Sequence, residues 1–219
     1  MADIPLRKRH GVASGQDVCY CHGNRANLNI CKDIPMLDPK KCTLYSGGAR
    51  GAESEFGRLA EKYGIEEVNF SFEGHQSERA RGVRALTSEE LMRKDVSLAY
   101  VSKLMNRAYS SAPIFRKVLQ SISWQVDSGH EIWIVGEVLE DGTVKGGTGW
   151  GAEFAKICNK PLFVFDQQKN GWFTWDGERW NPVADPAITH HHFTGTGTRF
   201  LEENGRQALA GLFSRSFSK

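Results

Sequence analysis

The stretch that organises this chain is Cys42-Thr-Leu-Tyr-Ser-Gly-Gly-Ala-Arg-Gly51. Its first half is typical of a short apolar strand, and its second half is a glycine-rich turn. From Ala52 onward, apolar side chains recur at helical spacing, and Gly64 ends the predicted helix. A second apolar strand follows at residues 68–72. Strand, glycine turn, helix and strand predict a βαβ unit, which implies a parallel, right-handed crossover.

The rest of the chain continues this alternation. Further helices are predicted at residues 87–107, 113–124, 152–158 and 200–213, and further strands at 131–136, 161–166 and 191–193. Trp172, Trp175 and Trp180 lie in a stretch rich in Gly and Asp, which predicts a small hairpin at one edge of the sheet. Four or five strands alternating with helices predict an α/β fold with a mostly parallel sheet and helices on both faces.

Length and composition favour a single domain. The 219 residues, 40% of them hydrophobic, can bury one sizeable core. Residues 1–41 are polar and irregular and are predicted to form an N-terminal extension, so the domain is expected at 42–219. A net charge of +2 is too small to indicate nucleic acid or a membrane surface as a partner. With no long apolar run and no signal-peptide pattern at the N-terminus, we expect a cytoplasmic protein.

The five cysteines do not form a recognisable metal or disulfide pattern. An odd number in an intracellular chain favours free thiols. Cys19, Cys21, His22 and Cys31 have the residue types of a zinc site, but their spacing matches no common ligand set. Their role stays open, and we predict neither a metal nor a cofactor.

Three turns rich in Gly, Ser, Thr or Arg follow predicted strands, at residues 46–51, 145–151 and 194–199. In a parallel sheet such turns share the carboxyl edge, where ligands bind. Glycines let backbone N–H groups form one concavity, and the N-terminus of a helix from Ala152 adds a positive partial charge. These features predict a phosphate-binding edge. No G-x-x-x-x-G-K-[ST] motif is present, and no acidic residue closes the second strand, which disfavours a P-loop ATPase and a dehydrogenase.

Other polar side chains are expected near the same edge. His75, Arg79, Arg81 and Arg84 follow the second strand, and arginine forks suit phosphate oxygens, although a solvated basic loop is an equal alternative. Glu53 begins the first helix, where an acid suits the helix dipole and could also touch a ribose. The run of three histidines at 190–192 is predicted to be strand-end surface, because alternate residues of a strand face opposite ways.

Two of the three turns resemble the SLOG superfamily. Tyr45-Ser-Gly-Gly-Ala-Arg-Gly-Ala-Glu53 resembles the S-G-G-A-x-G-A-[DE] opening of SLOG domains. The superfamily includes the lonely-guy phosphoribohydrolases, the ligand-binding domains of TRPM channels and sensor domains of bacterial anti-phage systems. Residues 145–153 are similar to the P-G-G-x-G-T-x-x-E motif of the lonely-guy enzymes. Lys145 replaces the usual proline and Trp150 the usual threonine. The resemblance covers about residues 42–213 and implies a Rossmann-like sheet with a nucleotide or ADP-ribose-type ligand.

The resemblance also implies an activity. In the hydrolases of the group, the glutamate of the motif acts at the ribose carbon of an N-glycosidic bond, assisted by an arginine from a preceding helix. Glu153 falls in register with that glutamate, and Arg116 is similar to that arginine, although it is followed here by a longer gap. A carboxylate near the sugar stabilises an oxocarbenium-like transition state or activates water.

The sequence therefore predicts a domain that binds a nucleotide-type small molecule. It either hydrolyses the N-glycosidic bond, with Glu153 and Arg116 as catalytic residues, or acts as a sensor or sequestering module without cleavage. A homodimer is compatible with the family but has no sequence feature of its own. The predicted ligand-binding residues are Ser46, Gly47, Gly48, Arg50, Gly51, His75, Arg79, Arg84, Gly146, Gly147, Thr148, Gly149, Trp150, Thr196, Thr198 and Arg199.

Overall fold

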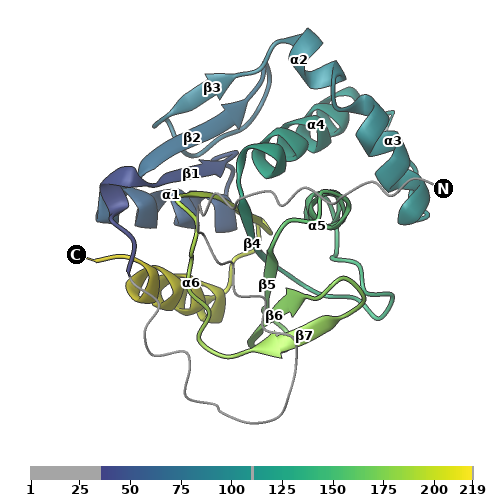
Figure 1. The fold of residues 1–219 in the computed structure, drawn as a ribbon. Helices are drawn as coiled ribbons and strands as arrows, with labels where there is room; N and C mark the ends of the chain where they lie inside the picture. Colours follow the sequence, from purple (N-terminus) through teal and green to yellow (C-terminus); the bar gives the residue numbers. More distant parts are fainter. Residues whose placement is uncertain (1–35, 110, 219) are drawn as a thin grey trace, which may run out of the picture. The chain divides into compact units, whose positions relative to one another are not determined.

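The computed structural model describes residues 36–109 and 111–218 (Figure 1). The strands are β1 (Thr43–Ser46), β2 (Glu66–Ser71), β3 (Val83–Ala85), β4 (Glu131–Gly136), β5 (Leu162–Asp166), β6 (Gly171–Trp175), β7 (Trp180–Val183) and β8 (His192–Gly197). The helices are η2 (Pro39–Lys41), α1 (Ala52–Tyr63), α2 (Ser88–Met92), α3 (Asp95–Leu104), α4 (Pro113–Ser128), α5 (Thr148–Ile157) and α6 (Glu203–Ser216). The four Cys and His residues weighed as a zinc site lie outside the described residues, as does most of the predicted extension.

All eight strands form one sheet in the order β3-β2-β1-β8-β4-β5-β6-β7. The first six strands of this order are parallel, and the hairpin of β6 and β7 adds two antiparallel strands at one edge. The last strand in the sequence, β8, lies between β1 and β4 and is therefore a central strand of the sheet. The predicted α/β fold with a mostly parallel sheet is confirmed, and so is the tryptophan-rich hairpin.

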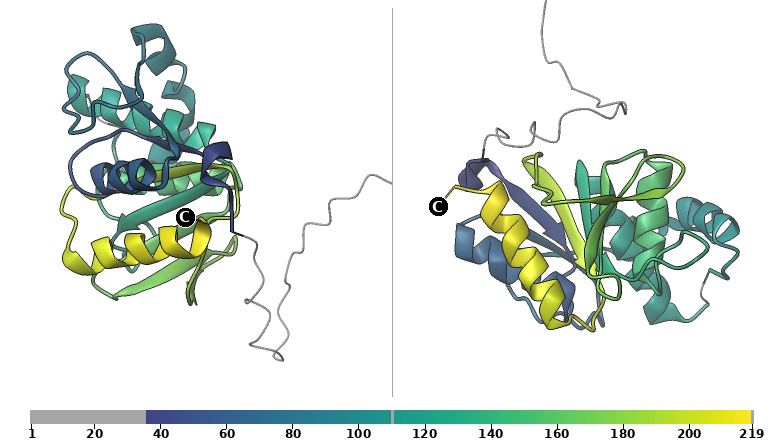
Figure 2. Two further views of the ribbon diagram at one scale, coloured as in Figure 1. Left: turned by 90° about the vertical axis from the view of Figure 1, so that its left-hand side faces the viewer. Right: turned by 90° about the horizontal axis from the view of Figure 1, so that it is seen from below.

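Helices cover both faces of the sheet. The chain runs from β1 through α1 to β2 in one direction and from β4 through α5 to β5 in the other. Right-handed crossovers in opposite directions place their helices on opposite faces. Accordingly α1 and α6 lie on one face, and α4 and α5 on the other (Figure 2). The result is a three-layer domain.

The strand period of two divides the buried side chains between the two layers. In β4, Trp133 and Val135 join the core under α1 and α6, while Ile132 and Ile134 join the core under α3, α4 and α5. A third, smaller cluster beneath α2 and α4 completes the β2–β3 edge. Its buried members are Phe70, Phe72, Leu86 and Leu91. Because α2 and α3 serve different clusters, the helix predicted at 87–107 is two helices instead of one.

Two of the glycine turns are shorter than predicted, because some of their glycines are packing positions. α5 begins at Thr148 and not at Ala152. A Cβ on Gly149 would lie 1.9 Å from the carbonyl oxygen of Val144. β8 continues to Gly197, and a Cβ on Gly195 would lie 2.5 Å from the ring of Phe56. The last helix begins at residue 203 and not at 200, and β3 is a strand that the pattern did not predict.

The described domain includes residues before Cys42. Leu37 pairs with Phe217 in an isolated parallel bridge, and its amide donates to the carbonyl of Ser216 at 2.8 Å. Segments from the two ends of the domain therefore lie side by side. Among the described residues, no helix is both long and apolar enough to cross a membrane.

A half-buried lysine, Lys160, connects α4 to the turn before β5. The Nζ of Lys160 donates to the carbonyls of Val126 (2.8 Å), Asp127 (2.7 Å) and Gly129 (2.6 Å), which lie at the C-terminal end of α4. The ammonium group satisfies carbonyls that the helix leaves unpaired and suits the negative end of its dipole.

Replacing Lys160 with Met should lower the free energy of unfolding by about 1–3 kcal/mol, because the three carbonyls lose a charged donor while the apolar stem is kept. Urea unfolding measures this. Lys103→Met is the matched control, since Lys103 is exposed in the last turn of α3 and its loss should change stability by less than about 0.5 kcal/mol. Equal losses in the two variants would contradict the role of Lys160.

Candidate functional site

A cavity of about 660 Å³ opens at the carboxyl edge of the central strands. It lies where the crossovers from β1 and β4 diverge, which is the position at which open parallel sheets bind ligands. Segments after five strands and one face of α4 surround it. The lining residues are Ala49, Arg50, Glu53, His75, Phe115, Val118, Ser121, Ile122, Gln125, Gly136, Glu137, Lys145, Gly146, Gly147, Thr148, Gln167, Gln168, Gly197, Thr198, Arg199, Phe200 and Glu202.

Glu53 forms the floor beside the first turn. Its carboxylate accepts hydrogen bonds from Thr196 Oγ1 (2.7 Å) and the amide of Ala49 (3.0 Å), and further ones from the Gly47 amide and the Gln125 side chain. The residue is 6% exposed, and burial raises its pKa above the ordinary value although the four donors oppose this. The carboxylate thus occupies the amide concavity in which a phosphate was expected.

Most of the remaining residues of the first turn make contacts within the protein and do not line the cavity. Ser46 donates to the carbonyl of Gly195 (2.7 Å), which joins β1 to β8. Gly48 has a positive φ of 66°, and its carbonyl accepts from Ser77 Oγ and two amides, so it holds the loop after β2. A Cβ on Gly51 would meet the backbone of Arg199 at 2.6 Å. Of the predicted binding residues in this turn, Arg50 alone lines the cavity.

The second turn leaves its first backbone amides without a protein acceptor among the described residues. After Lys145, the first backbone amides that donate a hydrogen bond are those of Gly149 and Trp150. The Gly149 amide donates to the Gly146 carbonyl (3.3 Å), and the Trp150 amide donates to the Gly147 carbonyl (3.1 Å). In the described structure, the amides at 146–148 donate to no protein acceptor, and Gly146, Gly147 and Thr148 line the cavity at the N-terminus of α5. This is the arrangement that binds anions at helix N-termini.

Trp150 does not reach the cavity. It is 4% exposed, packs in the core under α3, α4 and α5, and contacts the ring of Tyr109. The indole that replaces the motif's threonine is thus a core side chain, although Trp150 was predicted to bind the ligand.

The two residues predicted to be catalytic lie apart from the cavity lining. Glu153 pairs with Lys156 (2.8 Å), whose ammonium lies 3.8 Å from the ring centre of Trp175. Arg116 pairs with Asp95 through two nitrogens, and Asp95 also accepts from Tyr109 (2.7 Å). These partners give each side chain a structural role, and the structure does not bring the two together. The helical register of α5 turns Glu153 towards the β6–β7 hairpin.

The third turn contributes from the end of β8. Thr198 lines the cavity, and its Oγ1 accepts from the amide of Phe200 (3.1 Å). Its carbonyl accepts from the amide of Ala52 (2.9 Å), so it also fixes the start of α1. Arg199 is exposed and lines the cavity, whereas the hydroxyl of Thr196 is used by Glu53.

From the basic loop after β2, His75 alone enters the lining. Its ring stacks on Phe72 (4.7 Å between ring centres), and burial lowers its pKa. Arg79 binds the buried Glu67 at 2.7 Å. Arg84 pairs with Glu90 (3.0 Å) and lies over the ring of Trp124. These two arginines therefore brace the β2–β3 edge, and Arg81 also lies outside the lining.

The sequence patterns missed the α4 side of the cavity. Phe115, Val118, Ile122 and Gln125 follow one another at intervals of three or four residues and form one face of the helix. The same spacing is typical of helix residues in the core, so it could not indicate that these residues line a cavity. Gln125 is 1% exposed, and in the described structure its Oε1 has no hydrogen-bond partner. Such a buried acceptor is costly unless a donor reaches it.

Both signs of charge line the cavity. Arg50, Lys145 and Arg199 are cationic and exposed, and Lys145 pairs with Glu137 at 2.7 Å. The opposite charges are Glu53, buried at the floor, together with Glu137 and Glu202. Because cationic and acidic residues of the lining are equal in number, an anionic group would be favoured next to the unpaired amides of the second turn, while the floor suits a hydrogen-bond donor such as a hydroxyl.

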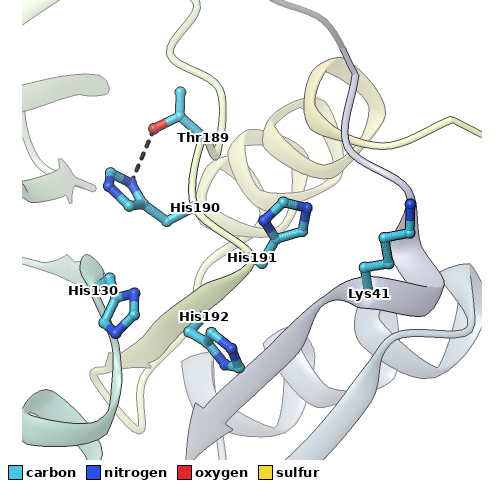
Figure 3. Close-up of a pocket in the computed structure, with 6 residues that line it drawn as sticks. All are labelled: Lys41, His130, Thr189, His190, His191 and His192. Atoms are coloured by element: carbon cyan, nitrogen blue, oxygen red, sulfur yellow. Dashed lines mark hydrogen bonds between the residues drawn. The ribbon is translucent and has the colours of Figure 1, made fainter. Parts of the chain in front are cut away.

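A second cavity, of about 470 Å³, lies at the amino-terminal edge of β4 and β8 (Figure 3). Its lining residues are Lys41, His130, Thr189, His190, His191 and His192. The ring centres of His130 and His192 are 5.4 Å apart, and Tyr45 contacts His192 Nδ1 at 3.3 Å. Within residues 36–109 and 111–218, no group of three His, Cys, Asp or Glu side chains could hold a metal ion.

No family model matches the sequence, and no curated protein matches it. A crystal structure named "Putative molybdenum carrier protein" from Syntrophus aciditrophicus SB is similar with 16% sequence identity and a TM-score of 0.48, over 80% of this chain and 94% of that one. A likeness this distant establishes neither a ligand nor an activity.

One histidine of the second cavity should make stability depend on pH. The carboxylate of Glu131, 3.3 Å from His190 Nδ1, raises the pKa of His190 above its ordinary value of 6.5. The stabilisation is fully present below the unfolded pKa and is lost as the pH rises through the folded pKa. His190→Asn should therefore cost more stability at pH 5.5 than at pH 8.5.

The difference should be a few tenths of a kcal/mol, because His190 is 43% exposed and its ion pair is screened by water. Melting temperatures at the two pH values measure it. His191→Asn, at the exposed neighbouring position, is the control and should show no such difference. A larger loss at pH 8.5 would contradict the assignment.

Proposed function

We propose that the cavity at the carboxyl edge binds a phosphorylated small molecule of the nucleotide type. The observation that carries the proposal is the second turn, whose unpaired amides at 146–148 open into the cavity at the N-terminus of α5. Anions bind at such positions because N–H donors and the helix dipole act together. Arg50, Lys145 and Arg199 are cations at the rim, of which Arg50 pairs with Glu78 and Lys145 with Glu137.

The size and polarity of the cavity support the proposal. A volume of about 660 Å³ is within the usual range for small-molecule sites. The phosphate would lie at the second turn, and a ribose hydroxyl could donate to the orphaned Gln125 Oε1 or to Glu53 after a small movement of the floor. The apolar face of α4, with Phe115, Val118 and Ile122, would contact the less polar part of the ligand.

We further propose that the chain is a divergent SLOG-type domain. The Ser-Gly-Gly-Ala turn after β1 and the Gly-Gly-x-Gly segment before α5 both support this, because the parallel sheet brings them to one edge. The departures at Lys145 and Trp150 do not remove the site, since Lys145 adds a rim charge and Trp150 packs in the core.

Binding without cleavage is the function that the geometry supports best. Glu153 and Arg116, the residues that the resemblance made catalytic, both have structural partners away from the cavity lining. A domain that holds a nucleotide signal needs neither of them. A sensor or a sequestering protein fits this description.

Hydrolysis remains a second candidate because Glu53, one of three glutamates that line the cavity, is buried there. Glu53 is buried there with a raised pKa, which suits a group that exchanges a proton with a substrate. We propose that any cleavage of an N-glycosidic bond would use Glu53 and not Glu153.

Binding is tested by calorimetry with AMP, ADP-ribose and NAD. Arg199→Gln should weaken the affinity for a phosphorylated ligand about 10- to 150-fold, since it removes a charge-assisted contact of about 1.5–3 kcal/mol. Arg84→Gln is the matched control and should leave the affinity unchanged, because Arg84 braces the sheet edge. If none of the three compounds binds, or if both variants lose affinity equally, the proposal fails.

Cleavage is tested by following free base by chromatography. If the domain hydrolyses any of these nucleotides, Glu53→Gln should abolish release, whereas Glu153→Gln should retain most of it. Thermal melting of both variants checks that they are folded, because Gln at position 53 leaves some of the turn's donors unpaired. Release that is lost with Glu153→Gln and kept with Glu53→Gln would reverse the assignment.

A further inference from the structure

Phe200 presents an aromatic residue to solvent at the cavity. It is 75% exposed, more than any other Phe, Tyr or Trp that the structure describes, and it belongs to the cavity lining. An apolar ring in water is unfavourable, and a ligand that covers the ring removes that apolar surface from water. The ring therefore favours any ligand that covers it.

The backbone of Phe200 is held in place by polar contacts. Its amide donates to Thr198 Oγ1 (3.1 Å), and its carbonyl accepts from Gln167 Nε2 (3.1 Å). The side-chain oxygen of the same glutamine, Gln167 Oε1, accepts from the backbone amide of Glu202 (2.8 Å). The segment between β8 and α6 is thus ordered without burying the phenyl ring. A ligand would meet a ring whose backbone is already positioned, which reduces the entropy cost of binding.

A second apolar surface lines the cavity from the other face of the sheet. Phe115 is 42% exposed and begins the stripe that continues with Val118 and Ile122 on α4. Its ring lies 3.6 Å from the place of a Cβ at Gly147, so it sits beside the second turn. Phe200 leads into α6, and α4 and α6 cover opposite faces (Figure 2). Apolar surface therefore borders the cavity on two sides.

Two cationic residues of the lining are neighbours of this apolar surface in the sequence or along the second turn. Arg199 immediately precedes Phe200, and Lys145 immediately precedes the amides beside Phe115. A ligand that joins an anionic group to a flat apolar ring would match this alternation. A sugar phosphate without a ring would leave the phenyl groups in water.

We infer that Phe200 is a specificity residue that stacks on a planar aromatic ring of the ligand, so that the cavity takes a nucleotide with its base in preference to the sugar phosphate alone. The inference rests on the proposed function and adds the part of the ligand that phosphate contacts do not recognise. Base–aromatic stacking tolerates any base because every base has a π-face.

The test compares AMP with ribose 5-phosphate, which has the same sugar and phosphate but no base. Calorimetry is done on the full chain as wild type, Phe200→Ala and Phe200→Trp. Phe200→Ala should weaken AMP binding about tenfold and leave ribose 5-phosphate unchanged. Phe200→Trp should restore AMP binding, because it keeps a stacking ring.

Tyr100→Ala is the matched control. Tyr100 is 54% exposed on α3 and is not part of the cavity lining, so its loss should alter neither affinity. Melting temperatures check folding. If Phe200→Ala is unstable, Phe200→Leu replaces it, since leucine keeps apolar bulk without a ring. Phe200→Leu should likewise weaken AMP binding and leave ribose 5-phosphate binding unchanged.

Two results would overturn the inference. If Phe200→Ala weakens both ligands equally or neither of them, ring stacking is wrong while the proposed phosphate site stands. If the wild type binds neither AMP nor ribose 5-phosphate at millimolar concentration but does bind ADP-ribose or NAD, the inference fails and the proposed function stands; if it binds none of the four compounds, both fail together.

Discussion

The hydrogen bonds of the Glu53 carboxylate connect the three parts of the molecule that meet at the site. The donors come from the turn after β1, from Thr196 on β8 and from Gln125 on α4. Removing a carboxylate from water is expensive, and burial indeed raises the pKa of Glu53. Four donors offset much of that cost. Through this one group the first turn, the central strand and the covering helix are held at fixed distances.

This interaction also determines which backbone groups remain for a ligand. The amides of Gly47 and Ala49 already donate to Glu53, so the first glycine turn holds an internal anion. The amides of the second turn have no such partner. Two turns with similar composition therefore have different roles. The first turn is followed by Glu53 in the first turn of α1, and its amides bind that carboxylate. The second turn has no carboxylate bound to its amides, and these amides face the cavity.

Much of the fold could be predicted from residue patterns. The βαβ unit at the start of the domain, the buried strands β4 and β5 and the tryptophan hairpin have short-range signals, because alternation, helical spacing and glycine boundaries act within a few residues. Long-range partners gave no such signal. Arg79 and Arg84 have the composition of a phosphate loop, yet Glu67 and Glu90 neutralise them. Gly149 and Gly195 have the composition of a ligand turn, yet they make room for Val144 and Phe56.

From the residue order alone, this chain is an α/β domain with ligand-type turns at the carboxyl ends of its strands. Local patterns suffice for that, since each element is specified by neighbours along the chain. Tertiary structure alone showed that β8 lies between β1 and β4, that Glu53 and not Glu153 lines the cavity, and that α4 supplies an apolar wall. The reason is physical: a side chain's role depends on which partner satisfies its charge or covers its surface. At this site such partners can be far apart in the sequence, as Thr196 and Glu53 are, at a separation of 143 residues.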